Sequence, residues 1–532
     1  MNCLAIEANG DIIVIDCGVT FPHTDLGIDI YHPDFDYLER RRDSIRGLVL
    51  THGHEDHIGA VPYLLRRINV PLWGPPHALA LIAEKLEERG FDARLLRSTA
   101  MIPRRTYTLG AFSIEPVRVT HSITDACALI IRVAGRTLVH TGDFKFDPTP
   151  PDGDPTDFER LSEVGQQGVD LLLSDSTNID AEGTSGSETS VGDALEQIVS
   201  GCEGRIVIGM FSSNVQRLRL VGQLARRTGR RICLLGRSVH THVRTATRIG
   251  RLEWPSDLLV PAELAATAPR KSLLCIASGT QAEPLAALWR LATRSHPAIA
   301  LERADTVILS SRIIPGNEPG VFRMFGHFIR QDIDVRSRIT DPGVHVSGHA
   351  HRNEQRRMIE MIRPRAFCPV HGTLHHLKRH ADFAHSLGVK DVVVAENGDV
   401  IELGAQGLRK VDMVEVGKVA TYDGEEIPDD VLKQREVLAR TGVAVVTLQV
   451  DARGKLLAPP FLSTRGVLDE GADIDLLKAA ARDVADALAG KPFVNERPTD
   501  QQIIDMAERA VRRNLDGISG RRPVTIVHVV RP

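Results

Sequence analysis

The stretch that decides the fold is Thr51-His52-Gly53-His54-Glu55-Asp56-His57, which follows the apolar run Leu48-Val49-Leu50. It places three imidazoles and the carboxylate of Asp56 within one short segment. Imidazole nitrogen and carboxylate oxygen are the ligands that ions such as Zn²⁺ and Mn²⁺ prefer. A polar surface loop is the alternative, but the spacing His-x-His-x-Asp-His matches a known ligand pattern and predicts a metal site.

Composition places the chain among ordinary globular proteins. It has 532 residues, of which 42% are hydrophobic and 25% charged, and this length allows about three domains. The formal net charge of -4 argues against a uniformly basic surface, so any nucleic acid would have to bind in a local channel. No Gly-x-x-x-x-Gly-Lys-Ser/Thr segment is present, which disfavours an ATP-driven enzyme.

The cysteines and the N-terminus predict a cytoplasmic protein. The seven cysteines are scattered, odd in number and without a Cys-x-x-Cys pair, which fits a reducing compartment. The N-terminal residues show no secretion signal, and no run of about 18 apolar residues occurs. We expect neither secretion nor membrane association.

Short β-branched runs repeatedly end in a polar or glycine-containing tip. These runs are residues 12–15 before Asp16, 48–50 before His52, 137–139 before Gly142-Asp143, and 171–173 before Asp175. Ligands in layered α/β proteins gather at the carboxyl ends of strands. We therefore expect the tips to converge on one edge of a stack of sheets.

A different rhythm, strand then helix, begins at about residue 196 and predicts a separate α/β unit. We expect strands at 205–210, 231–235 and 272–277, and helices at 215–227 and 283–294. Residues 344–350 and 367–372 are again rich in histidine, like the first 180 residues. We therefore predict that the middle unit is an insertion. The predicted boundaries are 1–195 and 346–415 for the divided domain, 196–345 for the insertion, 416–440 for a linker and 441–532 for a C-terminal domain.

The C-terminal domain is expected to contain strands, then helices, then a final strand. The predicted elements are strands at 443–450 and 460–464, helices at 475–488 and 500–514, and a strand at 524–530.

The His-x-His-x-Asp-His run resembles the signature of the metallo-β-lactamase superfamily. His121 at a strand end, Asp143 and His371 can fill the remaining coordination positions. The expected arrangement has His52, His54 and His121 on one ion, Asp56, His57 and His371 on a second ion, and Asp143 bridging them. The carboxylate of Asp16 is expected to accept hydrogen bonds from loop amides and to orient a neighbouring ligand.

Two divalent ions, most simply Zn²⁺ but with Mn²⁺ or Mg²⁺ possible, can activate water and polarise a phosphoryl oxygen. Hydrolysis is therefore the predicted reaction. Ester, lactam and phosphodiester substrates all stay open at this point, because metal ligands alone do not choose the electrophile.

Three further segments resemble the motifs of the β-CASP nucleases, which insert an α/β domain into the metallo-β-lactamase fold. They contain Asp175 in Ser174-Asp175-Ser176-Thr177-Asn178, His349 in Val346-Ser347-Gly348-His349, and His371 in Pro369-Val370-His371-Gly372. In having a histidine at the last motif, the chain resembles the RNA-processing members. DNA cross-link repair members usually carry valine there.

Nearly the whole chain resembles the ribonuclease J family. The matching segments are Phe211-Ser212-Ser213-Asn214, Gly236-Arg237-Ser238, Ser278-Gly279-Thr280-Gln281-Ala282-Glu283-Pro284, Ile314-Pro315-Gly316-Asn317-Glu318 and the C-terminal pattern ending Gly520-Arg521-Arg522-Pro523. The resemblance implies an α/β fold: a metallo-β-lactamase αββα sandwich with an inserted β-CASP domain and a small C-terminal α/β domain. It also implies a two-metal ribonuclease that hydrolyses single-stranded RNA from the 5′ end, favours 5′-monophosphate ends and has some endonuclease activity, in RNA decay and maturation.

By the same resemblance, His345, Ser347 and His349 would bind phosphate, and Ser213 and Asn214 would help hold a terminal 5′-phosphate. Asp56, His57, Asp175 and His349 form the implied catalytic set, in which Asp175 orients its neighbours and His349 protonates the leaving oxygen. Alternatively, Ser213 and Asn214 only cap the helix that starts near Val215.

The chain departs from the family at three places. It is expected to lack the family's first strand, because a glycine-rich segment usually precedes the residues that match Met1-Asn2-Cys3. Gln216 stands where members commonly have histidine, and Thr280 and Ala282 replace serine and glycine.

The resemblance implies a homodimer or homotetramer, and other RNA-degradation proteins are an open partner class. A catalytically silent RNA-binding scaffold is one alternative function, although such paralogues generally lose ligands. Another metallo-β-lactamase-fold hydrolase, acting on DNA or small esters, is a second alternative.

Overall fold

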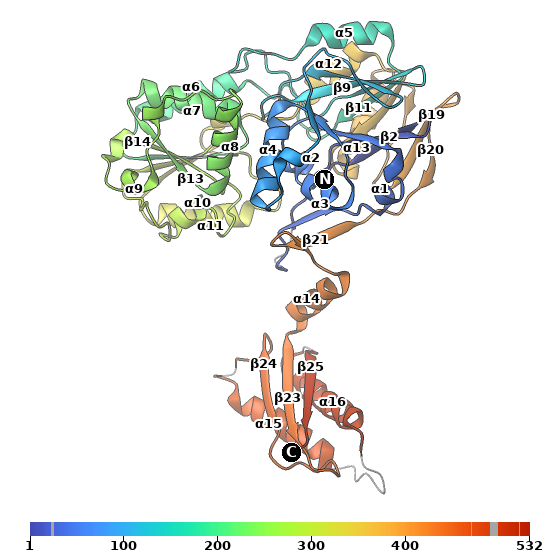
Figure 1. Ribbon diagram of the computed structural model, residues 1–532. Helices are drawn as coiled ribbons and strands as arrows, with labels where there is room; N and C mark the ends of the chain where they lie inside the picture. Colours follow the sequence, from blue (N-terminus) through green and yellow to red (C-terminus); the bar gives the residue numbers. More distant parts are fainter. Residues whose placement is uncertain (23–25, 470, 490–497, 521) are drawn as a thin grey trace. The chain divides into compact units, whose positions relative to one another are not determined.

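The computed structural model describes residues 1–22, 26–469, 471–489, 498–520 and 522–532, so Arg521 of the C-terminal motif lies outside the described residues. The chain divides into two compact units (Figure 1). The first unit contains Met1–Phe21 and His32–Lys418, and the second contains Pro22–Tyr31 and Val419–Pro532.

A pair of stacked β-sheets forms the centre of the first unit. The smaller sheet has the order β1-β2-β4-β5-β6 and the larger has the order β18-β17-β11-β10-β9-β8-β7. The smaller sheet consists of β1 (Leu4–Ala8), β2 (Asp11–Ile15), β4 (Ile45–Val49), β5 (Leu72–Gly74) and β6 (Ser98–Ala100). The larger consists of β7 (Tyr107–Leu109), β8 (Phe112–Arg118), β9 (Cys127–Val133), β10 (Arg136–His140), β11 (Leu171–Asp175), β17 (Ala366–Val370) and β18 (Asp391–Val392).

Helices cover the outer faces of both sheets. They are α1 (Asp36–Arg40), α2 (Glu55–Ile58), α3 (Val61–Arg67), α4 (Pro76–Glu88), α5 (Phe158–Gln167), α12 (Arg352–Ile362) and α13 (Leu374–Ser386). Helix α4 packs on β5 and β6, whereas α5, α12 and α13 share a core with the outer face of the larger sheet. A hairpin of β19 (Asp399–Gly404) and β20 (Gly407–Met413) follows.

The apolar runs are continuous because both faces of each sheet are covered. Ile13 and Ile15 of β2 pack against Leu129 of β9 in the core between the sheets. Ile130, the next residue of β9, points the other way and packs with Phe367 in the core beneath the helices. This helix–sheet–sheet–helix sandwich confirms the predicted fold class.

The polar tips of the strands meet at one edge, as predicted. Strand β2 is parallel to β4, and β11 is parallel to both β10 and β17, so their carboxyl ends coincide within each sheet. The residues that follow these strands come within hydrogen-bond distance across the two sheets: the Asp143 carboxylate lies 3.1 Å from the ring of His57. The stacked sheets thereby gather groups that are far apart in the sequence.

The middle of the chain forms its own parallel sheet, with the order β13-β14-β12-β15-β16 (Figure 1, green). Its strands are β12 (Ile206–Gly209), β13 (Arg231–Leu235), β14 (Leu273–Ala277), β15 (Thr306–Leu309) and β16 (Asp334–Ser337). One face packs against α6 (Glu188–Ser200), α7 (Val215–Arg227) and α8 (Arg237–Arg248), and the other against α9 (Ala262–Ala265), α10 (Ala287–Ala292) and α11 (Glu318–Ile329). This sheet is the inserted domain.

One predicted helix of the insertion is much shorter than expected. Helix α10 covers Ala287–Ala292 rather than 283–294. Ala282 has a φ of 62°, which is the left-handed region, and Pro284 disfavours a helical conformation for the residue before it. The chain therefore turns through 279–286 before the helix begins, and the family's glycine would be the less strained residue at position 282.

The C-terminal part of the second unit is a three-stranded sheet with two helices on it, close to the prediction. Strands β24 (Phe461–Arg465), β23 (Val443–Gln449) and β25 (Val524–Val530) pair in that order, with β23 parallel to β25. Helices α15 (Ile474–Ala489) and α16 (Asp500–Ser519) cover one face. Helix α16 runs five residues beyond the predicted end and stops at Gly520, whose φ of 63° favours glycine.

The predicted linker at 416–440 is structured. It forms β21 (Lys418–Tyr422), β22 (Glu425–Glu426) and most of α14 (Asp429–Thr441). Ala420 and Ile427 of this segment pack on Ile28, which lies just before β3 (Ile30–Pro33) in the sequence. The predicted domain boundaries stay predictions. Among the helices of the described residues, none has the length and apolar character needed to cross a membrane.

Candidate metal centre

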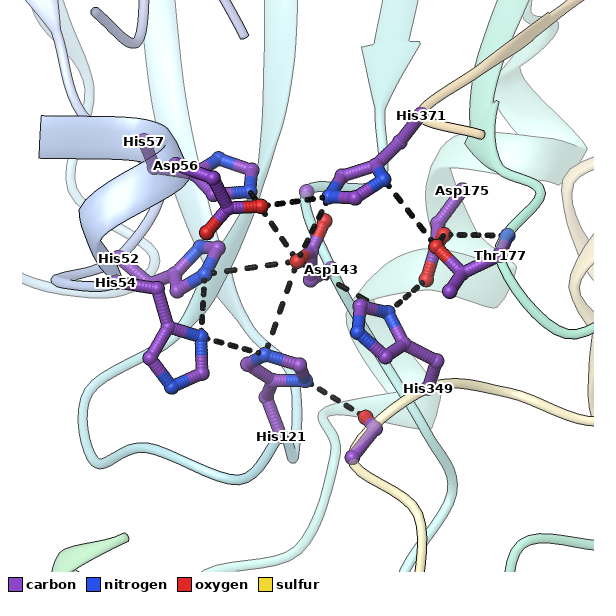
Figure 2. A network of polar contacts seen from close by, with 12 residues as sticks. His52, His54, Asp56, His57, His121, Asp143, Asp175, Thr177, His349 and His371 are labelled. Atoms are coloured by element: carbon purple, nitrogen blue, oxygen red, sulfur yellow. Dashed lines mark hydrogen bonds and ion pairs between the residues drawn. The ribbon is translucent and has the colours of Figure 1, made fainter. Parts of the chain in front are cut away.

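Seven predicted ligands come together at the carboxyl edge of the stacked sheets (Figure 2). His52 and His54 lie in the loop after β4, and Asp56 and His57 lie in the short helix α2 that follows. His121, Asp143 and His371 come directly after β8, β10 and β17, strands of the other sheet. Both sheets therefore contribute donor atoms to one place.

The first cluster consists of His52, His54, His121 and Asp143, whose donor atoms all lie within 4.8 Å of one another. His54 Nδ1 is 3.1 Å from His52 Nε2 and 3.0 Å from His121 Nε2. The Asp143 Oδ2 atom lies 3.6 Å from His52 Nε2 and 3.7 Å from His121 Nε2. These nitrogens face a common point rather than solvent.

The second cluster consists of Asp56, His57, Asp143 and His371. Asp143 Oδ2 lies 3.1 Å from His57 Nε2 and 3.3 Å from His371 Nε2. Asp56 Oδ2 lies 3.2 Å from His371 Nε2 and 3.5 Å from His57 Nε2. One oxygen of Asp143 is thus common to both clusters.

Hydrogen bonds on the far side of each ring determine which nitrogen faces the clusters. The carboxylate of Asp16 accepts from His57 Nδ1 at 2.8 Å, and the carbonyl of Gly348 accepts from His121 Nδ1 at 2.6 Å. A carboxylate or carbonyl can only accept, so Nδ1 carries a proton in both rings and Nε2 is the nitrogen that faces the cluster.

Two threonine hydroxyls orient the rings of His52 and His371 in the same way. The hydroxyl of Thr51 donates to Asp16 at 2.8 Å and therefore accepts from His52 Nδ1 at 3.0 Å. The hydroxyl of Thr177 donates to Asp175 at 2.6 Å and therefore accepts from His371 Nδ1 at 3.2 Å. In His52 and His371, too, Nε2 is therefore the nitrogen that faces Asp143.

This donor set fits divalent metal. Imidazole nitrogens and carboxylate oxygens that converge at 3.0–3.7 Å can share a cation, and rings held by outer partners are typical of metal-ligating histidines. In both clusters, the ring nitrogens that could bind an ion already face the place where it would lie.

The charges of the site act on its histidines in opposite directions. Burial lowers the pKa of His52 and of His121 well below the usual range, which keeps both rings neutral. Burial also acts to lower the pKa of His57, but Asp143, Asp56 and Asp16 outweigh it and raise the pKa to about 10. The carboxylates of the second cluster therefore demand positive charge.

The loop that carries Asp16 packs closely against the backbone of the metal-binding segment at Asp56 and His57. Asp16 has a φ of 58°, and a Cβ added at Gly18 would lie 1.6 Å from the carbonyl oxygen of Asp56. The amide of Cys17 donates to the carbonyl of His57 at 2.7 Å. The chain at 16–18 is therefore pressed against the metal-binding loop, where no side chain larger than hydrogen fits at position 18.

His349 and Asp175 form a third group beside the bridging carboxylate (Figure 2). Asp175 Oδ2 accepts from His349 Nδ1 at 2.9 Å, and that nitrogen lies 3.9 Å from Asp143 Oδ2. Burial acts to lower the pKa of His349, but Asp175 outweighs it and raises the pKa above the usual value. Asp175 thus holds the ring of His349, whose Nε2 is directed away from the Asp175 carboxylate.

The predicted phosphate-binding residues have different surroundings. Ser347 Oγ accepts from Asn178 Nδ2 at 2.8 Å, and His345 Nδ1 lies 3.0 Å from Arg217 Nη1. Asn214 is buried; its oxygen accepts from the Arg217 amide at 2.9 Å and its amide group donates to Glu188 at 3.2 Å. Both polar ends of Asn214 are therefore already bonded, which favours the helix-cap alternative for this residue.

Several residues of the site escaped the sequence reasoning. Asn2 donates to the carbonyl of Asp56 at 3.0 Å and lies 3.1 Å from His57 Nε2. Thr51 directly precedes the ligand His52, and Thr177 lies two residues after Asp175, so a hydroxyl close to a predicted site residue was the available signal. Asn2 and Arg217 gave no signal, because their partners are distant in sequence.

These features define a metal-dependent hydrolase of the metallo-β-lactamase fold that carries an inserted α/β domain. Comparison with protein-family models agrees: residues 2–198 match the metallo-beta-lactamase superfamily, 203–328 the ribonuclease J beta-CASP domain, 332–395 the Zn-dependent metallo-hydrolase RNA specificity domain and 430–532 the ribonuclease J C-terminal domain. The chain belongs to the ribonuclease J family.

Curated relatives support this assignment over nearly the full chain. A ribonuclease J of Mycobacterium tuberculosis is 37% identical, with 99% of this chain and 94% of the relative covered. The ribonuclease J 1 of Streptococcus pyogenes is 35% identical, with coverages of 100% and 95%. A ribonuclease J of Helicobacter pylori is 38% identical, with coverages of 86% and 67%.

A solved structure of a protein of unknown function from Enterococcus faecalis has a TM-score of 0.53 and 15% identity, and the match covers 74% of this chain and 94% of that one. At that identity the likeness supports the fold alone. Family membership and the His/Asp clusters together establish the chain as a metal-dependent ribonuclease that acts on RNA.

Gly348→Ala tests the contact that orients His121. An added Cβ would lie 2.4 Å from Ser122 Oγ and 3.1 Å from His121 Cε1, so the ring must shift. We expect the affinity for a divalent ion to fall by about tenfold to a hundredfold, the usual effect of disturbing an outer partner of a ligand. Competition with a chromophoric chelator measures it.

Gly320→Ala is the matched control, because its Cβ would meet Ala282 Cβ at an ordinary 3.4 Å. Unchanged metal affinity in Gly348→Ala would show that the Gly348 carbonyl does not hold His121.

Proposed function

We propose that the enzyme binds two divalent ions, Zn²⁺ in the first instance and Mn²⁺ or Mg²⁺ as alternatives. His52, His54 and His121 would hold one ion, Asp56, His57 and His371 the other, and Asp143 would bridge them. The observation that carries this assignment is the single Asp143 oxygen that lies within 3.1–3.7 Å of both sets of nitrogens. When bound, such an ion pair activates water and stabilises charge on a phosphoryl group.

We propose that His349 is the catalytic acid and that Asp175 orients it. Asp175 accepts from Nδ1, so the proton available to a substrate is on Nε2. His349 lies beside the bridging carboxylate, where a leaving oxygen of a bound phosphodiester needs a proton. Asp56 and His57 would act in catalysis as ligands of the second ion.

We propose that the loop at 345–349 binds the 5′-monophosphate of single-stranded RNA, so that the first phosphodiester bond meets the metal centre. His345 and Ser347 carry this part of the proposal. Ser213 is half-buried at the start of α7 and is its third member, whereas Asn214 contributes chiefly as the cap of that helix. One nucleotide would be released at a time in the 5′-to-3′ direction, and internal cleavage would occur where RNA enters without its end.

A catalytically silent scaffold is the weaker alternative, because all seven proposed ligands are present and their donor atoms converge. A DNA substrate is disfavoured by the match to an RNA specificity domain. The free thiols of all seven cysteines favour a reducing cytoplasm, where RNA decay and rRNA maturation take place.

The 5′ end preference can be measured with one single-stranded RNA labelled at its 3′ end. The RNA carries a 5′-monophosphate, 5′-triphosphate or 5′-hydroxyl and is incubated with metal-loaded enzyme. We expect stepwise shortening from the 5′ end that is fastest with the monophosphate. The Asp56→Ala/His57→Ala double variant should lose activity at least about a thousandfold, since it removes ligands of a metal that supplies several kcal/mol of stabilisation.

Internal cuts that ignore the 5′ group would instead make the enzyme mainly an endonuclease. Absence of metal-dependent cleavage would contradict the catalytic proposal and favour the scaffold.

We propose that the chain forms homodimers through the open face of the C-terminal sheet, or homotetramers in which two such dimers pair by a second contact. The alternate residues Ala444, Val446 and Leu448 of β23 are buried under the helices. On the other face, Phe461 is 68% exposed, Ile526 43% and Val530 46%. An apolar sheet face of this kind suits a second copy of itself, since a twofold interface pairs the same patch on both subunits.

Phe461→Glu tests this interface, because it places a charge at the most exposed apolar side chain of this face. We expect the molar mass measured by light scattering on a sizing column to fall from that of a dimer or tetramer. Leu285→Glu, at a side chain of the inserted domain that is 89% exposed, is the control and should leave the mass unchanged. An unchanged mass in Phe461→Glu would place the interface elsewhere.

A further inference from the structure

A fully buried arginine connects the inserted domain to the proposed phosphate-binding loop. Arg217 lies in the first turn of α7, and its side chain is 1% exposed. Glu188, at the start of α6, accepts from Arg217 Nε at 3.0 Å and from Nη2 at 2.8 Å. The carbonyl of Ser310, just after β15, accepts from Nη1 at 2.5 Å. The guanidinium is therefore held in one position.

Arg217 also contacts the hydroxyl of Ser310, at 3.3 Å, and the ring of His345. Its Nη1 atom lies 3.0 Å from His345 Nδ1. A guanidinium carries donors and no acceptor, so His345 Nδ1 must accept and cannot carry a proton. A neutral imidazole has one N–H, and in His345 that N–H is left at Nε2.

Charged neighbours keep His345 neutral. Burial, followed by the cations Arg217, Arg338, Lys145 and Arg312, lowers the pKa of His345 well below the usual range. Positive side chains around a neutral N–H donor also attract an anion. The surroundings of the ring thus favour a phosphate over a cation.

Two donors of the loop are left for a ligand. His345 Nε2 has no hydrogen-bond partner among the residues that the structure describes. Ser347 Oγ accepts from Asn178 Nδ2 at 2.8 Å and from the amide of His349 at 3.2 Å, so its own proton is free to donate. A phosphate oxygen is an acceptor only, and both groups match it.

We propose that Arg217, held by Glu188, is a positioning residue that sets the tautomer of His345 so that its Nε2–H donates to the 5′-phosphate of RNA. This inference rests on the proposed binding of a 5′-phosphate by the loop. It gives the inserted domain a defined part in substrate selection, because Arg217 reaches the loop from helix α7 and is held in place by Glu188 of α6.

The tautomer can be read directly by ¹⁵N NMR of the full chain labelled at its histidines, with the signals of His345 assigned by their loss in His345→Gln. We expect Nδ1 to show the chemical shift of an unprotonated nitrogen and Nε2 that of a protonated one. In Arg217→Met/Glu188→Gln, which removes the donor without leaving an unpaired buried charge, the preference should disappear. A protonated Nδ1 in the wild-type protein would overturn the proposal.

The kinetic test compares KM for RNA with a 5′-monophosphate and a 5′-hydroxyl. In Arg217→Met/Glu188→Gln, we expect KM for the monophosphate to rise about tenfold to a hundredfold, the range for a hydrogen bond to a charged group, and KM for the hydroxyl to change by no more than about twofold. Arg217→Lys, which keeps a donor, should recover most of the affinity. A purely structural role would raise KM for both RNAs and lower the melting temperature.

The two possible failures are distinguishable. If the wild-type enzyme does not prefer the monophosphate, the phosphate site itself is wrong. If that preference holds but both RNAs respond equally to the loss of Arg217, only the role of Arg217 is overturned.

Discussion

The structure of the first unit depends on one buried carboxylate, that of Asp143. Its Oδ2 atom lies within 3.9 Å of a ring nitrogen of each of five histidines, which are His52, His57, His121, His349 and His371. A buried carboxylate without compensating charge is strongly unfavourable. The surrounding nitrogens and a divalent cation supply that charge, so folding and metal binding favour the same arrangement of strand ends.

Strand topology explains why these groups meet. The ligands follow strands of both stacked sheets, and the parallel pairs β2–β4 and β11–β17 place carboxyl ends together. A further set of residues then selects the nitrogen that each ring presents. Asp16 acts on His57, Gly348 on His121 and Thr177 on His371. Catalysis would depend on this outer set as much as on the ligands, because a ring with its proton on the wrong nitrogen cannot bind metal.

Much of this could be predicted from the sequence where the signal is local. The His-x-His-x-Asp-His spacing lies within one loop, and helix α7 and strands β13 and β25 have the bounds that periodicity predicts. Helix α10 was predicted too long, since the left-handed Ala282 and the following Pro284 delay its start. The roles of Asn2 and Arg217 could not be predicted, because the first contacts residues more than fifty positions away and the second contacts His345 across 128 positions. Spacing along the chain contains no information on such contacts.

The most direct test of the account is the number of divalent ions per chain, measured by elemental mass spectrometry after metal loading and desalting. We expect two ions in the wild-type protein, one in His371→Ala, which removes a ligand of the second cluster alone, and none retained firmly in Asp143→Ala. A single ion in the wild-type protein, or two ions in Asp143→Ala, would contradict the claim that this carboxylate joins two metal sites.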